Sequence, residues 1–248
     1  MKAAAVALVL SLSLLAAERA LAADLPLPGG APIPPSSYYP ISPPLNWGGV
    51  YIGLNGGYGL GTSNWTNSRG STGNFADNGG LVGGTLGINY AGFGDWVLLG
   101  FEGDFDWSGA TGSAACSSLS PSGALGPNAT CQTRIDWLTT FRLRAGYTWS
   151  HFLFYATAGG AAGDFRLTTN PSGAFHNPTP PLGWAAGAGV EYLFTDSISA
   201  KIEYLYVNLG TVGCPTGTLC SADNASNSGS VSFKENLVRA GVNYKFIW

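Results

Sequence analysis

The most constraining feature of this chain is an alternation of period two, which recurs in segment after segment from Trp47 onward. Within a segment, large apolar residues occupy every second position, and Gly, polar or charged residues occupy the positions between them. We call each set of alternate positions a parity. Successive side chains of a strand point to opposite faces, so this pattern predicts strands with two different faces. Eight segments carry it: 50–60, 81–90, 97–107, 135–147, 152–162, 183–194, 198–208 and 236–248.

The connections between these segments alternate between short and long. Short ones fall near 92–95, 148–150 and 195–197, and long ones cover about 61–80, 108–133, 163–182 and 210–232. The long ones are rich in Gly, Ser, Asn, Pro and Thr, as loops are. Short turns at one end and long loops at the other are typical of an outer-membrane barrel, whose short turns face the periplasm. The prediction is all-β: an eight-stranded antiparallel up-and-down transmembrane β-barrel over 47–248, with short periplasmic turns and four long external loops.

The polarity of the two faces favours a barrel in lipid. Charged residues make up only 10% of the chain, against about 25% in ordinary globular domains. In lipid every backbone polar group must be paired within the protein, so strands must close into a barrel. Aromatic residues near strand ends, such as Tyr58, Tyr147 and Tyr192, fit interfacial girdles. We therefore expect apolar side chains to face outward and charged ones to face an enclosed lumen.

The polar parity carries a set of charges that we predict to form a lumen network. Its members are Glu102, Asp104, Asp106, Arg142, Arg144, Lys201, Glu203 and Arg239. The acidic row on 97–107 could instead be a catalytic or metal-binding cluster, because alternate residues of a strand share a face. The network is favoured because buried charges must be paired and because charges at membrane depth belong on the lumen side. We predict no catalytic residue, metal or cofactor.

The N-terminal region predicts export. A basic residue, an apolar run over 3–17 and a small-x-small motif at 20–22 indicate a signal peptide over 1–22. The alternative, a retained membrane helix, needs about 20 apolar residues, and Glu18 ends the run too early. The following Pro-rich stretch, 23–46, is predicted to be an extended periplasmic linker.

Four cysteines form two close pairs, Cys116 with Cys131 and Cys214 with Cys220. Export to an oxidising compartment permits disulfides, and an even count with local spacing favours pairing within each segment. A zinc site is the alternative, but the spacing is not that of metal fingers and no His lies near the pairs.

Catalytic motifs are weakly represented. The only histidines are His151, at a predicted periplasmic turn, and His176, in a predicted long loop. Neither has an evident carboxylate partner on a strand, which disfavours both a hydrolytic site and haem capture. The glycine-rich GGYGLG at 56–61 lacks the Lys and the helix of a phosphate-binding loop.

Several motifs resemble the small Gram-negative outer-membrane proteins of the 25/31-kilodalton group, within the porin-like membrane β-barrel superfamily. They are NWGGVYIGLNGGYGLG (46–61), FEGDFDWSG (101–109), DWLTTFRLRAGYTW (136–149), LFYATAGGAAGDF (153–165), GWAAGAGVEYLFTDSISAKIEYLYVNLG (183–210) and NLVRAGVNYKF (236–246). The resemblance implies a location in the outer membrane, a structural or porin-like role, exposed loops and no catalytic residues. It also implies a terminal assembly signal, here Tyr244, Phe246 and Trp248, although the chain ends at Trp rather than Phe.

The leading functional hypothesis is a structural barrel that supports the envelope and displays surface loops. The alternatives are a narrow pore for ions or small solutes and a loop-mediated adhesin or receptor; an enzyme ranks last. Expected partners are outer-membrane lipid, lipopolysaccharide and the barrel-assembly machinery, with peptidoglycan or a host surface as further candidates. A net charge of −3 and a pI near 5.2 argue against nucleic acid, which usually meets a basic patch.

Overall fold

The structure is a computed structural model, and the residues that it describes are 45–67, 70–92, 96–119, 128–170, 173–176, 180–213 and 229–246. The predicted signal peptide, most of the predicted linker, Cys214, Cys220 and Trp248 lie outside this part of the chain. No helix within the described ranges is long and apolar enough to cross a membrane.

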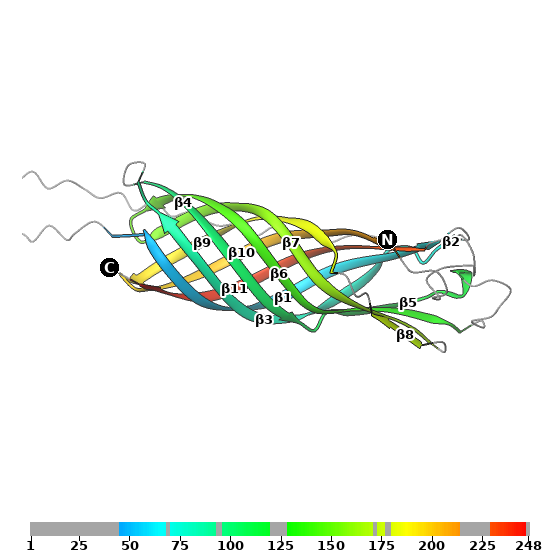
Figure 1. The fold of residues 1–248 in the computed structure, drawn as a ribbon. Helices are drawn as coiled ribbons and strands as arrows, with labels where there is room; N and C mark the ends of the chain where they lie inside the picture. Colours follow the sequence, from blue (N-terminus) through cyan, green and yellow to red (C-terminus); the bar gives the residue numbers. More distant parts are fainter. Residues whose placement is uncertain are drawn as a thin grey trace, which may run out of the picture. The chain divides into compact units, whose positions relative to one another are not determined.

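Eight long strands form a closed antiparallel ring (Figure 1). Around the ring they are β1 (Gly49–Asn67), β3 (Phe75–Tyr90), β4 (Val97–Ser108), β6 (Thr130–Trp149), β7 (Phe152–Asn170), β9 (Leu182–Thr195), β10 (Ile198–Gly213) and β11 (Ser230–Phe246). The last strand pairs with the first, from Val50↔Phe246 to Thr66↔Ser230. The ring therefore has no free edge along its spanning length, which confirms the predicted eight-stranded barrel.

Short connections gather at one end of the barrel, beside the C-terminal end of β11. Residues 150–151 join β6 to β7, and residues 196–197 join β9 to β10. Ser150 has a φ of 54°, as the tight turns of two-residue hairpins require. In an outer-membrane barrel this end faces the periplasm, and we call it the inner end.

Within the described part of the chain, the opposite, outer end carries four short elements: β2 (Gly70–Ser71), β5 (Thr111–Ala115), η1 (Ser117–Leu119) and β8 (Gly173–His176). The strands themselves also reach further than the sequence predicts. The parts of β1, β3, β6, β7, β10 and β11 beyond the predicted strands, which we call the outer extension, are 61–67, 75–80, 130–134, 163–170, 209–213 and 230–235. Much of the predicted long-loop sequence is thus strand.

Along the inner part of the strands, large apolar side chains point away from the bore. Leu54 is 76% exposed and Leu143 is 70% exposed. We call this surface the lipid-facing band; it includes Ile52, Leu54, Tyr58, Val82, Leu86, Ile88, Leu99, Phe101, Phe105, Trp107, Phe141, Leu143, Val190, Ile202, Tyr204, Val238 and Val242. Apolar side chains exposed at this density need a hydrocarbon surrounding.

One local prediction about the faces is wrong. The alternation over 135–147 places Ile135 on the same face as Trp137, yet Ile135 is fully buried inside the ring. The reason is a β-bulge: the β6–β7 register shifts between Ile135 and Trp137, leaving Asp136 as an extra residue. A bulge inverts the phase of the alternation on its far side.

Candidate functional site

The filled interior of the ring is the candidate site. All eight charges predicted for the lumen point into it and are buried. The register places opposite charges on adjacent strands, with Glu102 opposite Arg142 and Glu203 opposite Arg239. Directly opposed residues are the closest neighbours on one face of a sheet. Residues far apart in the chain therefore meet in one ring of ion pairs, which we call the charge layer: Glu102, Asp104, Asp106, Arg142, Lys201, Glu203 and Arg239.

Arg142 is the centre of the charge layer. Its Nη2 lies 2.6 Å from Glu102 Oε1, and its Nη1 lies 2.9 Å from Glu203 Oε1. The same guanidinium also pairs with Asp104, while its Nε donates to Thr140 Oγ1 at 3.1 Å. Bidentate contacts between a guanidinium and carboxylates are the strong form of this interaction.

Arg239 and Lys201 complete the charge layer from the other side of the bore. Arg239 donates to Glu203 Oε2 at 2.8 Å, to Asp106 Oδ2 at 2.9 Å and to Asp104 Oδ2 at 3.0 Å. Lys201 Nζ lies 2.8 Å from Glu102 Oε2. Each carboxylate of the acidic strand therefore contacts at least one cation, as a dehydrated interior demands.

Small inward residues make room for these long side chains. A Cβ on Gly57 would lie 2.6 Å from Arg239 Cβ, and one on Gly83 would lie 2.2 Å from Asp106 Oδ1. Any larger residue would collide with the charge layer. The abundance of glycine on the polar parity thus has a packing cause.

Arg144, which the sequence selected, belongs to a second group nearer the inner end. The other members of this group, Glu191, Tyr51 and Tyr155, were not selected from the sequence. Arg144 pairs with Glu191, donates to Tyr51 Oη at 3.2 Å and stacks over the Tyr155 ring at 3.7 Å from its centroid. Tyr51 Oη in turn donates to Glu102 Oε2 at 2.8 Å, which joins this group to the charge layer. The parity of Glu191 and Tyr51 was the available signal, since both fall on the glycine-rich face of their segments.

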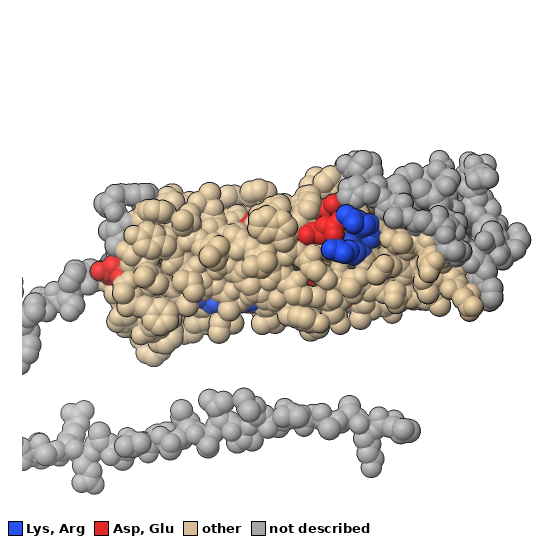
Figure 2. Space-filling view, turned by 90° about the horizontal axis from the view of Figure 1, so that it is seen from below, with Lys and Arg blue, Asp and Glu red and all other residues tan. Residues whose placement is uncertain are grey.

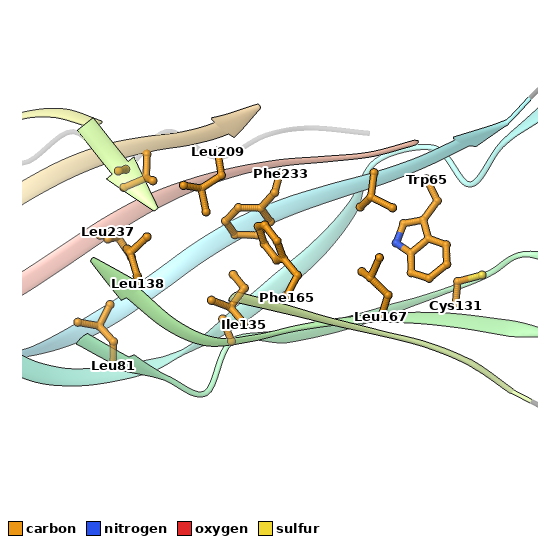
Figure 3. Packing of buried hydrophobic residues seen from close by; sticks show 14 of the residues in the cluster. Trp65, Leu81, Cys131, Ile135, Leu138, Phe165, Leu167, Leu209, Phe233 and Leu237 are labelled. Carbon is orange, nitrogen blue, oxygen red and sulfur yellow. The ribbon is translucent and has the colours of Figure 1, made fainter. Parts of the chain in front are cut away.

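Apolar side chains fill the bore on the outer side of the charge layer (Figure 3). They include Trp65, Phe165 and Phe233, and the Phe165 and Phe233 rings meet edge to face with centroids 5.2 Å apart. The Trp65 indole donates to Thr133 Oγ1 at 2.9 Å. We call this cluster the outer plug; its larger members are Trp65, Leu81, Ile135, Leu138, Phe165, Leu167, Leu205, Val207, Leu209, Val231, Phe233 and Leu237.

A smaller apolar cluster fills the inner end of the bore. Its members, the inner plug, are Trp47, Leu98, Leu153, Tyr155 and Leu193, with Leu45 packed against them. Leu45 and Trp47 precede β1, and Lys245 of β11 bonds the intervening Asn46 carbonyl. The start of the described chain therefore folds into the bore, and the interior has three layers: inner plug, charge layer and outer plug.

The predicted disulfide between Cys116 and Cys131 lies at the outer end, with Cα atoms 5.7 Å apart. It ties the segment after β5 to β6, and Asn67 donates to the Leu119 carbonyl at 3.0 Å nearby. Both sulfur-bearing side chains are buried against the outer plug. The second predicted pair, Cys214 with Cys220, lies outside the described residues.

The two histidines lie at opposite ends of the barrel. His151 lies in the β6–β7 turn, where its Nδ1 is 3.1 Å from Ser150 Oγ and its ring stacks on Tyr192. His176 ends β8 at the opposite end of the barrel. Within the described ranges no three His, Cys, Asp or Glu side chains come together in a way that could hold a metal ion.

Comparison with known proteins gives the same architecture. A family model described as "Outer membrane protein beta-barrel domain" matches residues 4–246. The chain belongs to this family. It is therefore an outer-membrane β-barrel protein, as the alternation and the motifs predicted.

Its relatives include the 25/31-kilodalton proteins. The "31 kDa outer-membrane immunogenic protein" of Brucella melitensis biotype 1 is 34% identical over 217 residues, covering 82% of this chain and 85% of the relative. The "22 kDa outer membrane protein" of Rhizobium leguminosarum is 28% identical, covering 84% and 82%. Among solved structures, Neisserial surface protein A (NspA) matches with a TM-score of 0.43 and 17% identity, over 79% of this chain and 97% of that one. The predicted family resemblance is confirmed.

Proposed function

We propose that this protein is a sealed structural barrel that supports the outer membrane and displays its outer extension at the cell surface. The observation that carries the proposal is the three-layered interior. Arg142 and Arg239 are buried between carboxylates in the middle of the bore, and apolar plugs lie on both sides. Eight-stranded barrels are narrow enough for side chains to fill them.

The narrow-pore alternative is less well supported by this arrangement. An ion crossing the bore would have to pass the outer plug, where Trp65, Phe165 and Phe233 meet. It would then have to disrupt several short ion pairs, and breaking a buried pair costs about 3–5 kcal/mol. A conducting state would therefore require the side chains of the outer plug and the charge layer to be rearranged.

The proposal assigns no enzymatic activity. It includes export by a signal peptide over 1–22, a periplasmic linker over 23–46 and recognition of the terminal aromatics by the assembly machinery. Adhesion through the outer extension is a second candidate function. It is favoured by the strands that continue beyond the lipid-facing band with polar outer faces and by the disulfide that fixes their end.

Planar-bilayer recording tests the sealed barrel. We expect the refolded wild-type protein to give no steady open steps, because no continuous water path crosses the plugs. A double variant, Phe165→Ala with Phe233→Ala, should give more current, and Leu143→Ala on the lipid-facing band is the matched control. Folding of each sample is checked by the shift in gel mobility on heating.

Steady open steps from the folded wild-type barrel would contradict the sealed structure. If the Phe165→Ala with Phe233→Ala variant conducted no more than the control, the outer plug would not be the barrier, and the charge layer would become the next target.

A further inference from the structure

The outward-facing charges of the described strands are concentrated at one place. Arg134, Asp136, Asp164 and Arg166 lie on the adjacent strands β6 and β7, and Lys234 lies apart on β11. Figure 2 shows the barrel wall as a largely uncharged surface with a charged patch next to the outer end. The four residues on β6 and β7, which we call the rim cluster, begin directly beyond Trp137, where the lipid-facing band ends.

The two arginines of the rim cluster are paired in an unusual way. Arg134 and Arg166 are directly opposed in the β6–β7 register, and like charges so placed are destabilising. Asp136 compensates by bridging them, with Arg134 Nε at 2.9 Å from Oδ1 and Arg166 Nη2 at 2.9 Å from Oδ2. The β-bulge turns Asp136 to the outside, so the same irregularity that buries Ile135 also builds this bridge.

The rim arginines keep capacity for an external ligand. Their side chains are 55% and 52% exposed, and a guanidinium has five N–H donors, of which one carboxylate uses few. A phosphate is the ligand that two fixed guanidinium groups suit best, through short charge-assisted bonds. Asp136 holds the pair in place, and Asp164 of the same cluster also takes part in an interaction.

Below the rim cluster, the outward residues of β7 form a strip of small side chains within the lipid-facing band, which we call the groove. The outward residues of β7 there are Ala156, Ala158, Gly160 and Ala162, and nothing lies within 4 Å of a Cβ placed on Gly160. Exposed large side chains flank this strip, with Phe141 of β6 and Trp184 of β9 both opposite Gly160. Nearer the inner end the flanking residues are small, with Ala145 and Ala188 opposite Ala156. Toward the inner end the groove widens into a hollow of about 860 Å³, bordered by Tyr147, Phe154, Val190, Ile202 and Tyr204.

We propose that the rim cluster and this groove form a binding site for a phosphorylated lipid of the outer leaflet. The phosphate contacts Arg134 and Arg166, and one acyl chain lies along β7 over Ala158 and Gly160. Two half-exposed guanidinium groups and their depth select this occupant, because the arginines stand near the border of the apolar band, where lipid phosphates lie. Basic residues at such borders recognise anionic headgroups.

Native mass spectrometry in detergent, with bisphosphorylated lipid A as the probe, tests the site. We expect Arg134→Gln with Arg166→Gln to weaken binding about tenfold, a loss that two charge-assisted bonds can account for. Ala158→Leu, which fills the groove, should weaken it as well. The matched controls are Lys234→Gln, an outward cation elsewhere, and Ala240→Leu, an outward alanine on β11; neither should change binding.

Two further probes distinguish the source of the phosphate. Lipid A without phosphates should bind the wild-type protein more weakly and be insensitive to the arginine variants. Inorganic phosphate alone should not compete at millimolar concentration, since it lacks the acyl contact. If it does compete, the cluster is a simple anion site and the lipid proposal is wrong.

Equal lipid A binding by wild type and both test variants would overturn the proposal. A change of oligomeric state in Ala158→Leu with unchanged lipid binding would also overturn it, because the groove would then be a contact between barrels. All variants are on the outer wall, so bilayer conductance and heat-dependent mobility report separately on the sealed barrel.

Discussion

The lipid-facing band and the outer extension are built from the same strands but have opposite polarity. In the band, Leu54 and Phe101 point outward while Asp104 and Arg142 point inward. In the outer extension, Trp65 and Phe233 point inward while polar residues cover the outside: Thr62, Asn64, Thr66, Asn78, Thr130, Gln132, Arg134, Thr168, Ser230, Ser232 and Lys234.

This comparison separates two questions: what makes a segment form a strand, and what decides which face of the strand is apolar. The alternation of period two and the antiparallel register run without interruption along β1 and β11 through both regions. Only the medium outside the wall changes, from hydrocarbon to water. In the lipid-facing band, apolar residues point outward into hydrocarbon. In the outer extension, they point inward and exclude water from the interior.

The largest expected effect is in the charge layer. Arg142→Ala should destabilise the refolded barrel by about 4 kcal/mol, because it leaves Glu102, Asp104 and Glu203 short of a cation in a dry interior. Thermal unfolding of the refolded protein measures the effect. Arg134→Ala is the control on the water-exposed wall, and it should cost less than about 1 kcal/mol. A melting temperature unchanged by Arg142→Ala would remove the charge layer as a source of stability.

A somewhat smaller effect is expected in the outer plug. Phe233→Ala should destabilise the barrel by about 3 kcal/mol, because it removes a buried ring and leaves a cavity beside Phe165. The same measurement on Phe101→Ala, an outward ring in the lipid-facing band, should show a smaller loss. If the outward ring mattered more than the inward one, the outer extension would not be a packed water-excluding core.

The smallest expected effect has the opposite sign. Glu235 is buried in the outer extension, and its Oε1 has no hydrogen-bond partner among the described residues. Glu235→Gln should therefore stabilise the barrel by about 1 kcal/mol, because a neutral amide is less costly to bury than a carboxylate. Glu203→Gln, which removes a paired carboxylate, should destabilise it. Equal shifts in the two melting temperatures would show that pairing does not distinguish the two regions.

The sequence predicted the band much better than the outer extension. Eight strands, the direction of Leu99 and Phe101, and the buried position of the acidic row all follow from parity. The strands of the outer extension were not predicted because they are rich in Gly, Ser, Asn and Thr, a composition that indicates loops. Trp65 and Phe233 were the residues that could have extended the prediction, since their parity opposes that of the band.

Other details could not be read from a single chain. The bulge at Asp136 depends on the partner strand, so the inward turn of Ile135 had no signal in its own segment. The choice of Glu191 as the partner of Arg144 depends on which strands neighbour in the ring and at what offset. Parity gives the face of a side chain, but tertiary register gives its neighbour.

Because β11 closes the ring by pairing with β1, the order in which the strands are synthesised has a consequence. Synthesis supplies β1 first and β11 last. The backbone groups on one edge of β1 therefore stay unpaired until residues 230–246 have been made. Unpaired strand edges can hydrogen-bond to strands of other chains. Every incomplete copy of this protein is therefore prone to aggregation. A nascent chain therefore needs shielding on its way to the membrane, and a copy truncated before Ser230 should be degraded instead of accumulating as a smaller barrel.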